Sequence, residues 1–132
     1  MPSGQSSECR LDLSVVQADI GRFFEGRRLE SQQLLRVIYD TCSGQGPNVV
    51  VWIDGKELVF GTKELNEGMG FVRIMPFETS SILVFPRGHE IPDPQKKTSG
   101  VINSRTTMTL YYASDVDAYV RRMIAAAYAL DA

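Results

Sequence analysis

The spacing of hydrophobic positions changes along the chain and separates helical from extended segments. In residues 13–24 and 31–42 the apolar side chains recur every three or four positions, which predicts one amphipathic helix in each range. Residues 49–85 instead carry short β-branched and aromatic runs divided by turn residues, which predicts four consecutive strands. The pattern predicts a fifth strand over 105–112, and the return to helical spacing over 114–128 predicts a closing helix.

Turn and capping residues mark several of these boundaries. The run 43–47, Ser-Gly-Gln-Gly-Pro, ends the second predicted helix, because glycine adopts the left-handed cap and proline cannot continue a helix. The Asp54-Gly55 dipeptide favours a type I′ hairpin turn. Residues 114–117, Ser-Asp-Val-Asp, resemble a capping box with Asp in place of Glu, which predicts that the last helix begins directly after Ser114.

The element order predicts an α+β fold class with two N-terminal helices, an antiparallel meander sheet of four to five strands, and a C-terminal helix packed on the sheet. Residues 1–12 are mostly small and polar and are predicted to form a flexible N-terminal segment, which leaves 13–132 as a single domain.

Alternation along the predicted strands places apolar side chains on both faces of the sheet. Arg73 and Met75 point to the face opposite that of Val72 and Ile74. Because helices cover only one face, apolar groups on the other face need a further cover. A partner subunit, the loop 88–100 or a ligand would each provide it.

Composition narrows the class of protein. The chain has 132 residues, 43% of them hydrophobic and 23% charged, which suits one compact domain without disulfide or zinc staples. With 14 basic and 16 acidic side chains the net charge is −2, which argues against nonspecific nucleic-acid binding as the main role. Cys9 and Cys42 lack the short spacing of zinc or redox motifs, so a cytoplasmic location is expected. No apolar run suits a signal peptide or a membrane span, so no membrane contact is expected.

Two segments of the chain resemble a known family. The run 23–28, Phe-Phe-Glu-Gly-Arg-Arg, leads into the second helix, and the C-terminal helix begins with 114–117 and continues through 126–128, Ala-Ala-Tyr. With the β meander between them, these segments resemble the uncharacterised YdhG-like domains. The resemblance implies a small α+β domain with helices packed on a curved antiparallel sheet, and it implies little about function.

Some relatives in that family are described as frataxin-like iron chaperones, a role that depends on an acidic helix face. This sequence departs from that pattern. In the first predicted helix Arg22 lies between Asp19 and Glu25, and in the second Arg36 interrupts the acidic positions. No carboxylate ridge forms, so iron binding is a less favoured role.

Candidates for catalytic chemistry are few. His89 is the single histidine, and a metal site would combine it with Glu90 and Asp93, but the prolines around them exclude the helix that would align the three. Cys42 lies on the apolar side of the second helix, which predicts a buried and inert thiol. No nucleophile elbow, phosphate-binding loop or zinc-protease motif occurs in the sequence. We therefore predict no catalytic residue, no metal and no cofactor.

Polar and aromatic side chains on the strands are candidates for a binding site. Arginines on or beside different strands could together receive a carboxylate or phosphate, with a tryptophan as the wall of the site. The residues predicted to bind such a small anionic ligand are Trp52, Arg73, Arg87, His89, Arg105 and Tyr111. The same pattern fits a structural role, in which Trp52 anchors the core and each arginine lays its stem over apolar surface.

The sequence favours a noncatalytic domain, either a homodimer or a partner-binding module, that uses the sheet face not covered by helices. The alternative is a small-ligand binding protein or minor enzyme with a site between the sheet and the loop 88–100. Single-stranded nucleic-acid binding is less favoured, because the densest basic patch consists only of Lys96 and Lys97 near Arg105.

Overall fold

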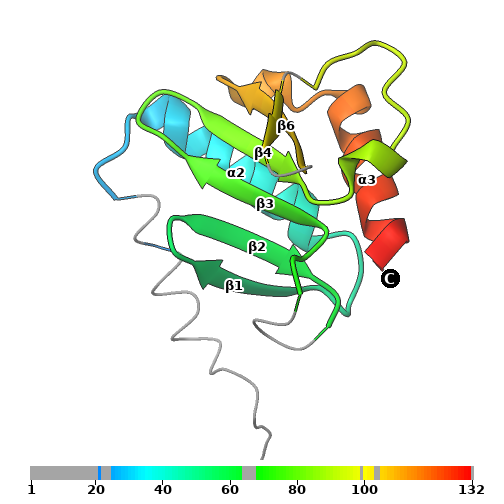
Figure 1. Ribbon diagram of the computed structural model, residues 1–132. Helices are drawn as coiled ribbons and strands as arrows, with labels where there is room; N and C mark the ends of the chain where they lie inside the picture. The colour runs from blue at the N-terminus through cyan, green and yellow to red at the C-terminus, as the bar shows by residue number, and fades with distance from the viewer. Residues whose placement is uncertain (1–20, 22–24, 64–67, 99, 103–104, 132) are drawn as a thin grey trace, which may run out of the picture.

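The computed structural model describes residues 21, 25–63, 68–98, 100–102 and 105–131. Within these ranges the chain forms one sheet with two long helices and two short 3-10 helices beside it (Figure 1). The helices are α2 (Leu29–Ser43), α3 (Ala118–Asp131), η1 (Gly88–Glu90) and η2 (Ala113–Asp115). The strands are β1 (Val50–Asp54), β2 (Glu57–Gly61), β3 (Val72–Pro76), β4 (Ser81–Phe85), β5 (Gly100–Ile102) and β6 (Arg105–Leu110). The first predicted helix, over 13–24, lies outside the described residues except for Gly21.

The strands form a single antiparallel sheet in the order β1-β2-β3-β4-β6-β5. All five predicted strands are present, and the first four follow one another as the predicted meander. β6 pairs with β4, and β5 pairs with the outer side of β6. The sequence pattern does not predict β5, because three residues are too few to show alternation. The α+β class is confirmed.

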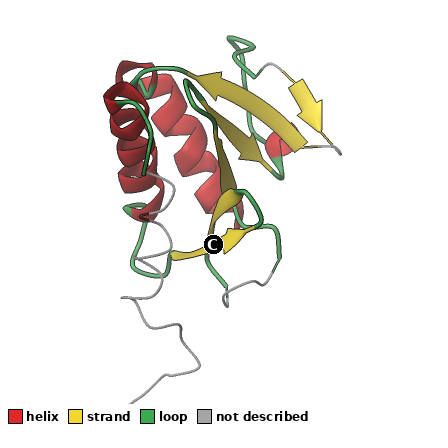
Figure 2. Cartoon of the chain, turned by 90° about the vertical axis from the view of Figure 1, so that its left-hand side faces the viewer, coloured by secondary structure: helices red, strands yellow, loops and turns green. Residues whose placement is uncertain are grey.

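Both long helices pack against one face of the sheet and bury the core there (Figure 2). α2 contributes Leu34, Leu35 and Ile38, and α3 contributes Met123 and Ile124, all of which are fully buried. Alternate strand residues complete the same cluster: Leu58, Phe60, Val72, Ile74, Leu83, Phe85, Met108 and Leu110. The helical periodicity in the sequence thus predicted the buried stripes of both helices.

On the face of the sheet opposite the helices, the central row of side chains is buried. One row of register partners crosses the sheet on this side, and each member is at most 7% exposed: Trp52, Val59, Arg73, Val84 and Thr107. The centre of this face therefore offers no exposed apolar surface. Met75 and Ile82, which pair in the next row on this face, are only partly buried, so the predicted use of this face by a partner stays a prediction.

The last helix begins one turn later than predicted. The N-cap is Asp117, whose carboxylate accepts a hydrogen bond from the backbone N–H of Val120 at 3.0 Å. Asp115 points the other way, and its carboxylate accepts from the backbone N–H groups of Tyr111 and Tyr112, both at 2.9 Å. The predicted capping box is therefore wrong in its position: Ser114, the predicted cap, lies inside η2, and Asp117, predicted at the third helical position, is itself the N-cap of α3.

Residues 91–98, which we call the strap, lie against α3 on the helix side of the sheet (Figure 1). The Asp93 carboxylate holds the strap closed. It accepts hydrogen bonds from the backbone N–H groups of Lys97 and Thr98 at 3.0 Å, from the Thr98 hydroxyl at 2.7 Å, and from the Tyr119 hydroxyl on α3. Lys97 and Arg122 lie over the ring of Tyr119, 5.3 and 4.8 Å from its centroid. This part of the predicted loop 88–100 is thus away from Trp52 and Arg73.

We expect Tyr119→Phe to loosen the strap without unfolding the domain. Burial raises the pKa of the Asp93 carboxyl, but the hydrogen bonds from Tyr119, Thr98 and Lys97 outweigh burial and hold that pKa well below its ordinary value of 3.8. Their stabilising effect is complete above that ordinary value and is lost as the pH falls below it toward the folded pKa. Without the Tyr119 hydroxyl, the Asp93 pKa rises toward its ordinary value in an NMR titration. Amide exchange at Lys97 and Thr98 accelerates about tenfold.

Tyr111→Phe is the matched control for the strap, since the exposed Tyr111 hydroxyl makes no hydrogen bond with the described residues. This variant should leave the Asp93 titration unchanged. If Tyr119→Phe also leaves the titration and the amide exchange unchanged, the strap does not depend on the Asp93 hydrogen bonds.

Candidate functional site

Arg73 is surrounded by groups of its own chain. Its side chain is 4% exposed, Nε donates to Glu57 Oε1 at 2.5 Å, and Nη2 donates to the Asp54 carboxylate. Nη1 donates to the backbone carbonyl of Met69 at 3.2 Å. Every guanidinium nitrogen is thus engaged, which favours a structural role for Arg73. Trp52, in the same buried row, is 4% exposed and likewise fits the core.

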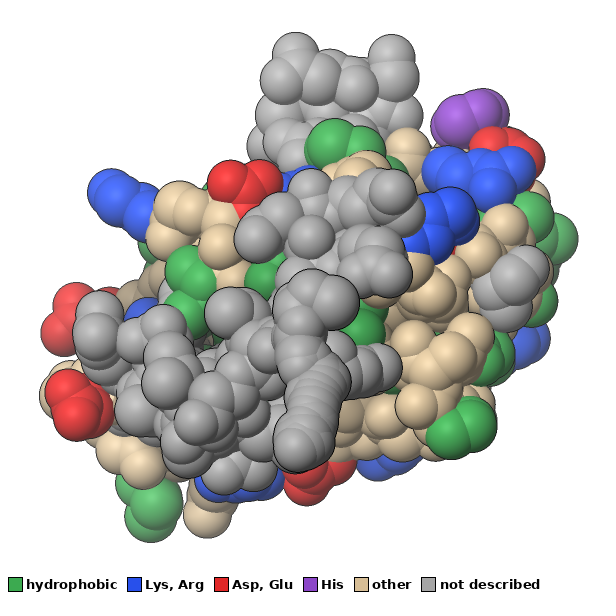
Figure 3. Space-filling view, turned by 90° about the horizontal axis from the view of Figure 1, so that it is seen from below, with side chains coloured by type: hydrophobic (Ala, Val, Ile, Leu, Met, Phe, Trp, Pro, Cys, Tyr) green, Lys and Arg blue, Asp and Glu red, His purple; other side chains and the backbone are tan. Residues whose placement is uncertain are grey.

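Arg87 and His89 lie in a second place, between the end of β4 and the C-terminal end of α3. Arg87 forms two hydrogen bonds of 2.7 Å with the Glu90 carboxylate, which lower the pKa of Glu90, and its Nη1 donates to the Leu130 carbonyl at 2.9 Å. His89 is exposed, with Nε2 3.7 Å from Glu90 Oε2. Figure 3 shows the single histidine at the rim of the molecule beside basic and acidic side chains. This group fastens η1 to α3.

Arg105 and Tyr111 lie in a third place, at opposite ends of β6. The backbone of Arg105 pairs with Ile102 at one end, and its side chain lies outside what the structure describes. Tyr111 follows the other end, about 20 Å away at 3.3 Å per strand residue, and is exposed. The six residues that the sequence predicts for a ligand site therefore do not form one described site.

Groups for metal or thiol chemistry are not found in the described part of the chain. No three His, Cys, Asp or Glu side chains there are placed to hold a metal ion. Cys42 is in the core, where burial raises the pKa of its thiol far above the ordinary range, as expected for a packing cysteine. Cys9 lies outside the described residues. Among the helices that the structure describes, none has the length and hydropathy to cross a bilayer.

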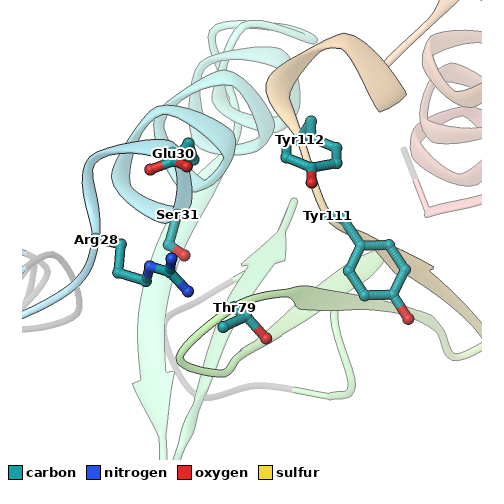
Figure 4. A pocket seen from close by; sticks show the side chains of 6 residues that line it. All are labelled: Arg28, Glu30, Ser31, Thr79, Tyr111 and Tyr112. Carbon is teal, nitrogen blue, oxygen red and sulfur yellow. The ribbon is translucent and has the colours of Figure 1, made fainter.

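A cleft of about 160 Å³ opens where α2 begins, beside the β3–β4 turn and the end of β6 (Figure 4). Its lining comes from these three places: Arg28, Glu30, Ser31, Thr79, Tyr111 and Tyr112. Two hydrogen bonds hold the start of α2 to the turn. Ser31 Oγ donates to the Glu78 carbonyl at 2.6 Å, and Arg27 Nη1 donates to the Phe77 carbonyl at 2.8 Å.

Two charged side chains of the cleft have no partner within the part of the chain that the structure describes. Neither Arg28 nor Glu30 makes a hydrogen bond or ion pair through its side chain with any described residue. Figure 4 shows the Arg28 guanidinium and the Tyr112 hydroxyl pointing into the same space, with Thr79 below them. The cleft thus presents donors and acceptors without a histidine or a thiol, which suits binding better than catalysis.

Exposed apolar side chains are found in the segments that form the cleft: Tyr111 and Tyr112 line it, and Leu29 and Phe77 belong to the start of α2 and the β3–β4 turn beside it. We call these four residues the tyrosine edge. Tyr111 and Tyr112 are 52% and 59% exposed, and Leu29 and Phe77 are 66% and 48% exposed. Among the other described large hydrophobic side chains, only Met69 is comparably exposed. The exposed apolar surface of the described residues is therefore concentrated at this end of the sheet.

Sequence reasoning identified only Tyr111 of this group as a binding residue. One signal was available for Tyr112, because two consecutive tyrosines at a strand exit cannot both point into the core. No sequence signal pointed to Arg28, since the packing of α2 against the β3–β4 turn brings it beside the tyrosines.

No family model matches the chain, and neither a curated protein nor a solved structure matches it. The resemblance to YdhG-like domains therefore stays a prediction.

Proposed function

We propose that this chain is a noncatalytic domain that binds a protein partner through the tyrosine edge. The observation that carries the proposal is the concentration of exposed apolar side chains beside a cleft that contains Arg28, whose side chain has no partner among the described residues. Tyrosine and arginine are enriched among the residues that dominate binding energy at protein interfaces. A tyrosine ring provides apolar contact area while its hydroxyl keeps a polar partner.

The volume of the cleft supports a protein contact over a metabolite site. About 160 Å³ is less than the roughly 300–1,000 Å³ of pockets that enclose small-molecule ligands. A cleft of this size accepts one side chain from a partner surface. The anionic-ligand alternative has less support, because Arg73 and Arg87 are both engaged within the chain.

The surroundings of His89 support a noncatalytic role. The imidazole is exposed on the surface and contacts Glu90, and no described hydroxyl or thiol is hydrogen-bonded to it. Nucleophilic catalysis with histidine as base needs such a pair within hydrogen-bond distance. The described residues therefore lack the usual Ser–His or Cys–His arrangement.

Photo-crosslinking in the native host tests the proposal. We expect p-benzoylphenylalanine in place of Tyr112 to give one discrete covalent protein adduct on illumination, because this side chain lies at the centre of the proposed contact. The same probe in place of Asp40, which is exposed near the opposite end of α2, is the matched control and should give no discrete adduct. The absence of an adduct at position 112, or the same adduct at both positions, would contradict the proposal.

A further inference from the structure

The walls of the cleft beside the tyrosine edge are fixed in place by hydrogen bonds. On one side, the Ser31 hydroxyl and the Arg27 guanidinium hold the start of α2 to carbonyl oxygens of the β3–β4 turn, at 2.6 and 2.8 Å. On the other side, the Asp115 carboxylate accepts hydrogen bonds from the backbone N–H groups of Tyr111 and Tyr112, both at 2.9 Å. The backbone that carries the lining residues is therefore ordered before a partner binds, which lowers the conformational entropy that binding costs.

Three groups that can donate hydrogen bonds meet in this cleft. The Arg28 guanidinium and the Tyr112 hydroxyl point into the same space, with Thr79 below them (Figure 4). They come from three different places in the fold: the start of α2, the end of β6 and the β3–β4 turn. None of the three side chains makes a hydrogen bond or ion pair with a described residue. Such a set of donors suits an acceptor, and the charge of the guanidinium favours an anionic one.

Glu30 is the acidic side chain among the lining residues of the cleft. In Figure 4 its carboxylate lies above Ser31, whereas the Arg28 guanidinium lies below Ser31, toward Thr79. A cationic side chain that entered the space between Arg28 and Thr79 would meet the guanidinium there, and like charges repel. The arrangement therefore favours an anion over a cation in the part of the cleft that the three donors share.

We propose that the partner of the tyrosine edge inserts an acidic side chain, Asp or Glu, into the cleft, where its carboxylate pairs with Arg28 and accepts hydrogen bonds from Tyr112 and Thr79. This inference rests on the proposed function and names the chemistry of the partner. The apolar contact around the cleft excludes water from the ion pair, which strengthens it. The pair also provides specificity, because a partner without the carboxylate leaves the guanidinium desolvated and unpaired.

Variants that remove one charge at a time test this proposal by photo-crosslinking in the native host. The p-benzoylphenylalanine probe takes the place of Phe77, which belongs to the tyrosine edge but does not line the cleft, so the three donors stay in place. We expect Arg28→Gln to lower the yield of the partner adduct about tenfold, because the neutral amide loses the ion pair. Glu30→Gln should not lower the yield. Arg121→Gln, at an exposed position on α3, is the matched control and should leave the yield unchanged.

The carboxylate itself is tested on the partner. Mass spectrometry of the adduct identifies the captured segment, and each acidic residue of that segment is replaced in turn by its amide. One of these replacements should raise the Kd of the purified pair about tenfold for the native chain and leave it unchanged for Arg28→Gln. Circular dichroism confirms that each variant is folded before its binding is measured.

The outcomes separate this inference from the proposed function. An adduct whose yield survives Arg28→Gln overturns the inference while the proposed function holds. An adduct that is lost on Glu30→Gln does the same, because the partner then supplies a cation, and so does a captured segment without an acidic residue that couples to Arg28. An adduct at position 112 with none at position 77 also overturns only the inference, because a side chain seated in the cleft brings its protein against the β3–β4 turn. The absence of any adduct at both positions overturns both.

Discussion

Gly88→Ala is expected to lower the free energy of unfolding by about 3 kcal/mol and the melting temperature by about 10 °C. Gly88 begins η1 and lies directly on Thr106 of β6. A Cβ at position 88 would come within 1.5 Å of Thr106 Oγ1 and 2.7 Å of Thr106 Cβ. Rotation of the threonine side chain moves Oγ1 but not Cβ, so the backbone of η1 or β6 has to shift. Thermal and urea denaturation followed by circular dichroism measure the effect.

Two variants test whether this contact is the cause. Gly21→Ala is the control, because a Cβ there meets no described residue within 4 Å. Thr106→Ala removes Oγ1, the closest atom, which is buried and has no hydrogen-bond partner among the described residues. Gly88→Ala should therefore lower the free energy of unfolding by clearly less in the Thr106→Ala variant than in the native chain. An equal cost in both backgrounds would show that the overlap with Thr106 Oγ1 is not responsible and would leave the overlap with Cβ, which alanine keeps, as the cause.

Glu57→Ala is expected to lower the free energy of unfolding by about 3 kcal/mol, since it removes the less exposed of the two carboxylates that neutralise a buried guanidinium. The Arg73 side chain is 4% exposed and that of Glu57 is 16% exposed, so the remaining charge lies out of reach of bulk water. Asp54 is 62% exposed and solvent screens its ion pair, so Asp54→Ala should cost less than about 1 kcal/mol. Urea denaturation measures both variants.

A double variant separates the loss of the ion pair from the loss of packing. Glu57→Leu combined with Arg73→Met removes both charges and keeps apolar volume, so it should cost less than Glu57→Ala alone. The single variants Glu57→Leu and Arg73→Met are measured in the same way. If the double variant loses as much free energy of unfolding as the two single variants together, the two side chains do not act as a pair. Equal effects of Glu57→Ala and Asp54→Ala would show that burial does not govern the strength of these contacts.

The elements that the sequence predicts well are those whose pattern is local. The buried stripe of α2 and the five longer strands follow from spacings of a few residues. The hairpin after β1 lies where the sequence predicts it, but its two loop residues are Gly55 and Lys56, and only Gly55 has a positive φ, +63°, so the predicted type I′ turn at Asp54-Gly55 is wrong. The predicted start of α3 is wrong because Ser114, the predicted cap, and Asp117, the observed one, are both good N-cap residues in the sequence. The position of the end of β6 assigns the Asp115 and Asp117 carboxylates each to its own backbone N–H groups.

The candidate binding residues were harder to predict, because the sequence does not distinguish an arginine that is paired within the fold from one that is left exposed. Strand register places Arg73 beside Glu57 and Asp54, which are 16 and 19 positions away, and thereby gives it a structural role. Arg87 lies beside Glu90, three positions away, and also contacts α3. Arg28 has no such partner among the described residues, and nothing in its neighbourhood along the chain indicates this.

By itself the sequence determined the α+β class, the buried faces of α2 and α3, and the order of the first four strands, because these depend on residues close together in the chain. The tyrosine edge depends on contacts between distant segments. Arg28, Thr79 and Tyr111 meet because α2 packs against the β3–β4 turn and β6 ends beside it. Only the tertiary structure decided which polar side chains were neutralised and which apolar side chains stayed exposed, since both depend on neighbours that the chain brings together by folding.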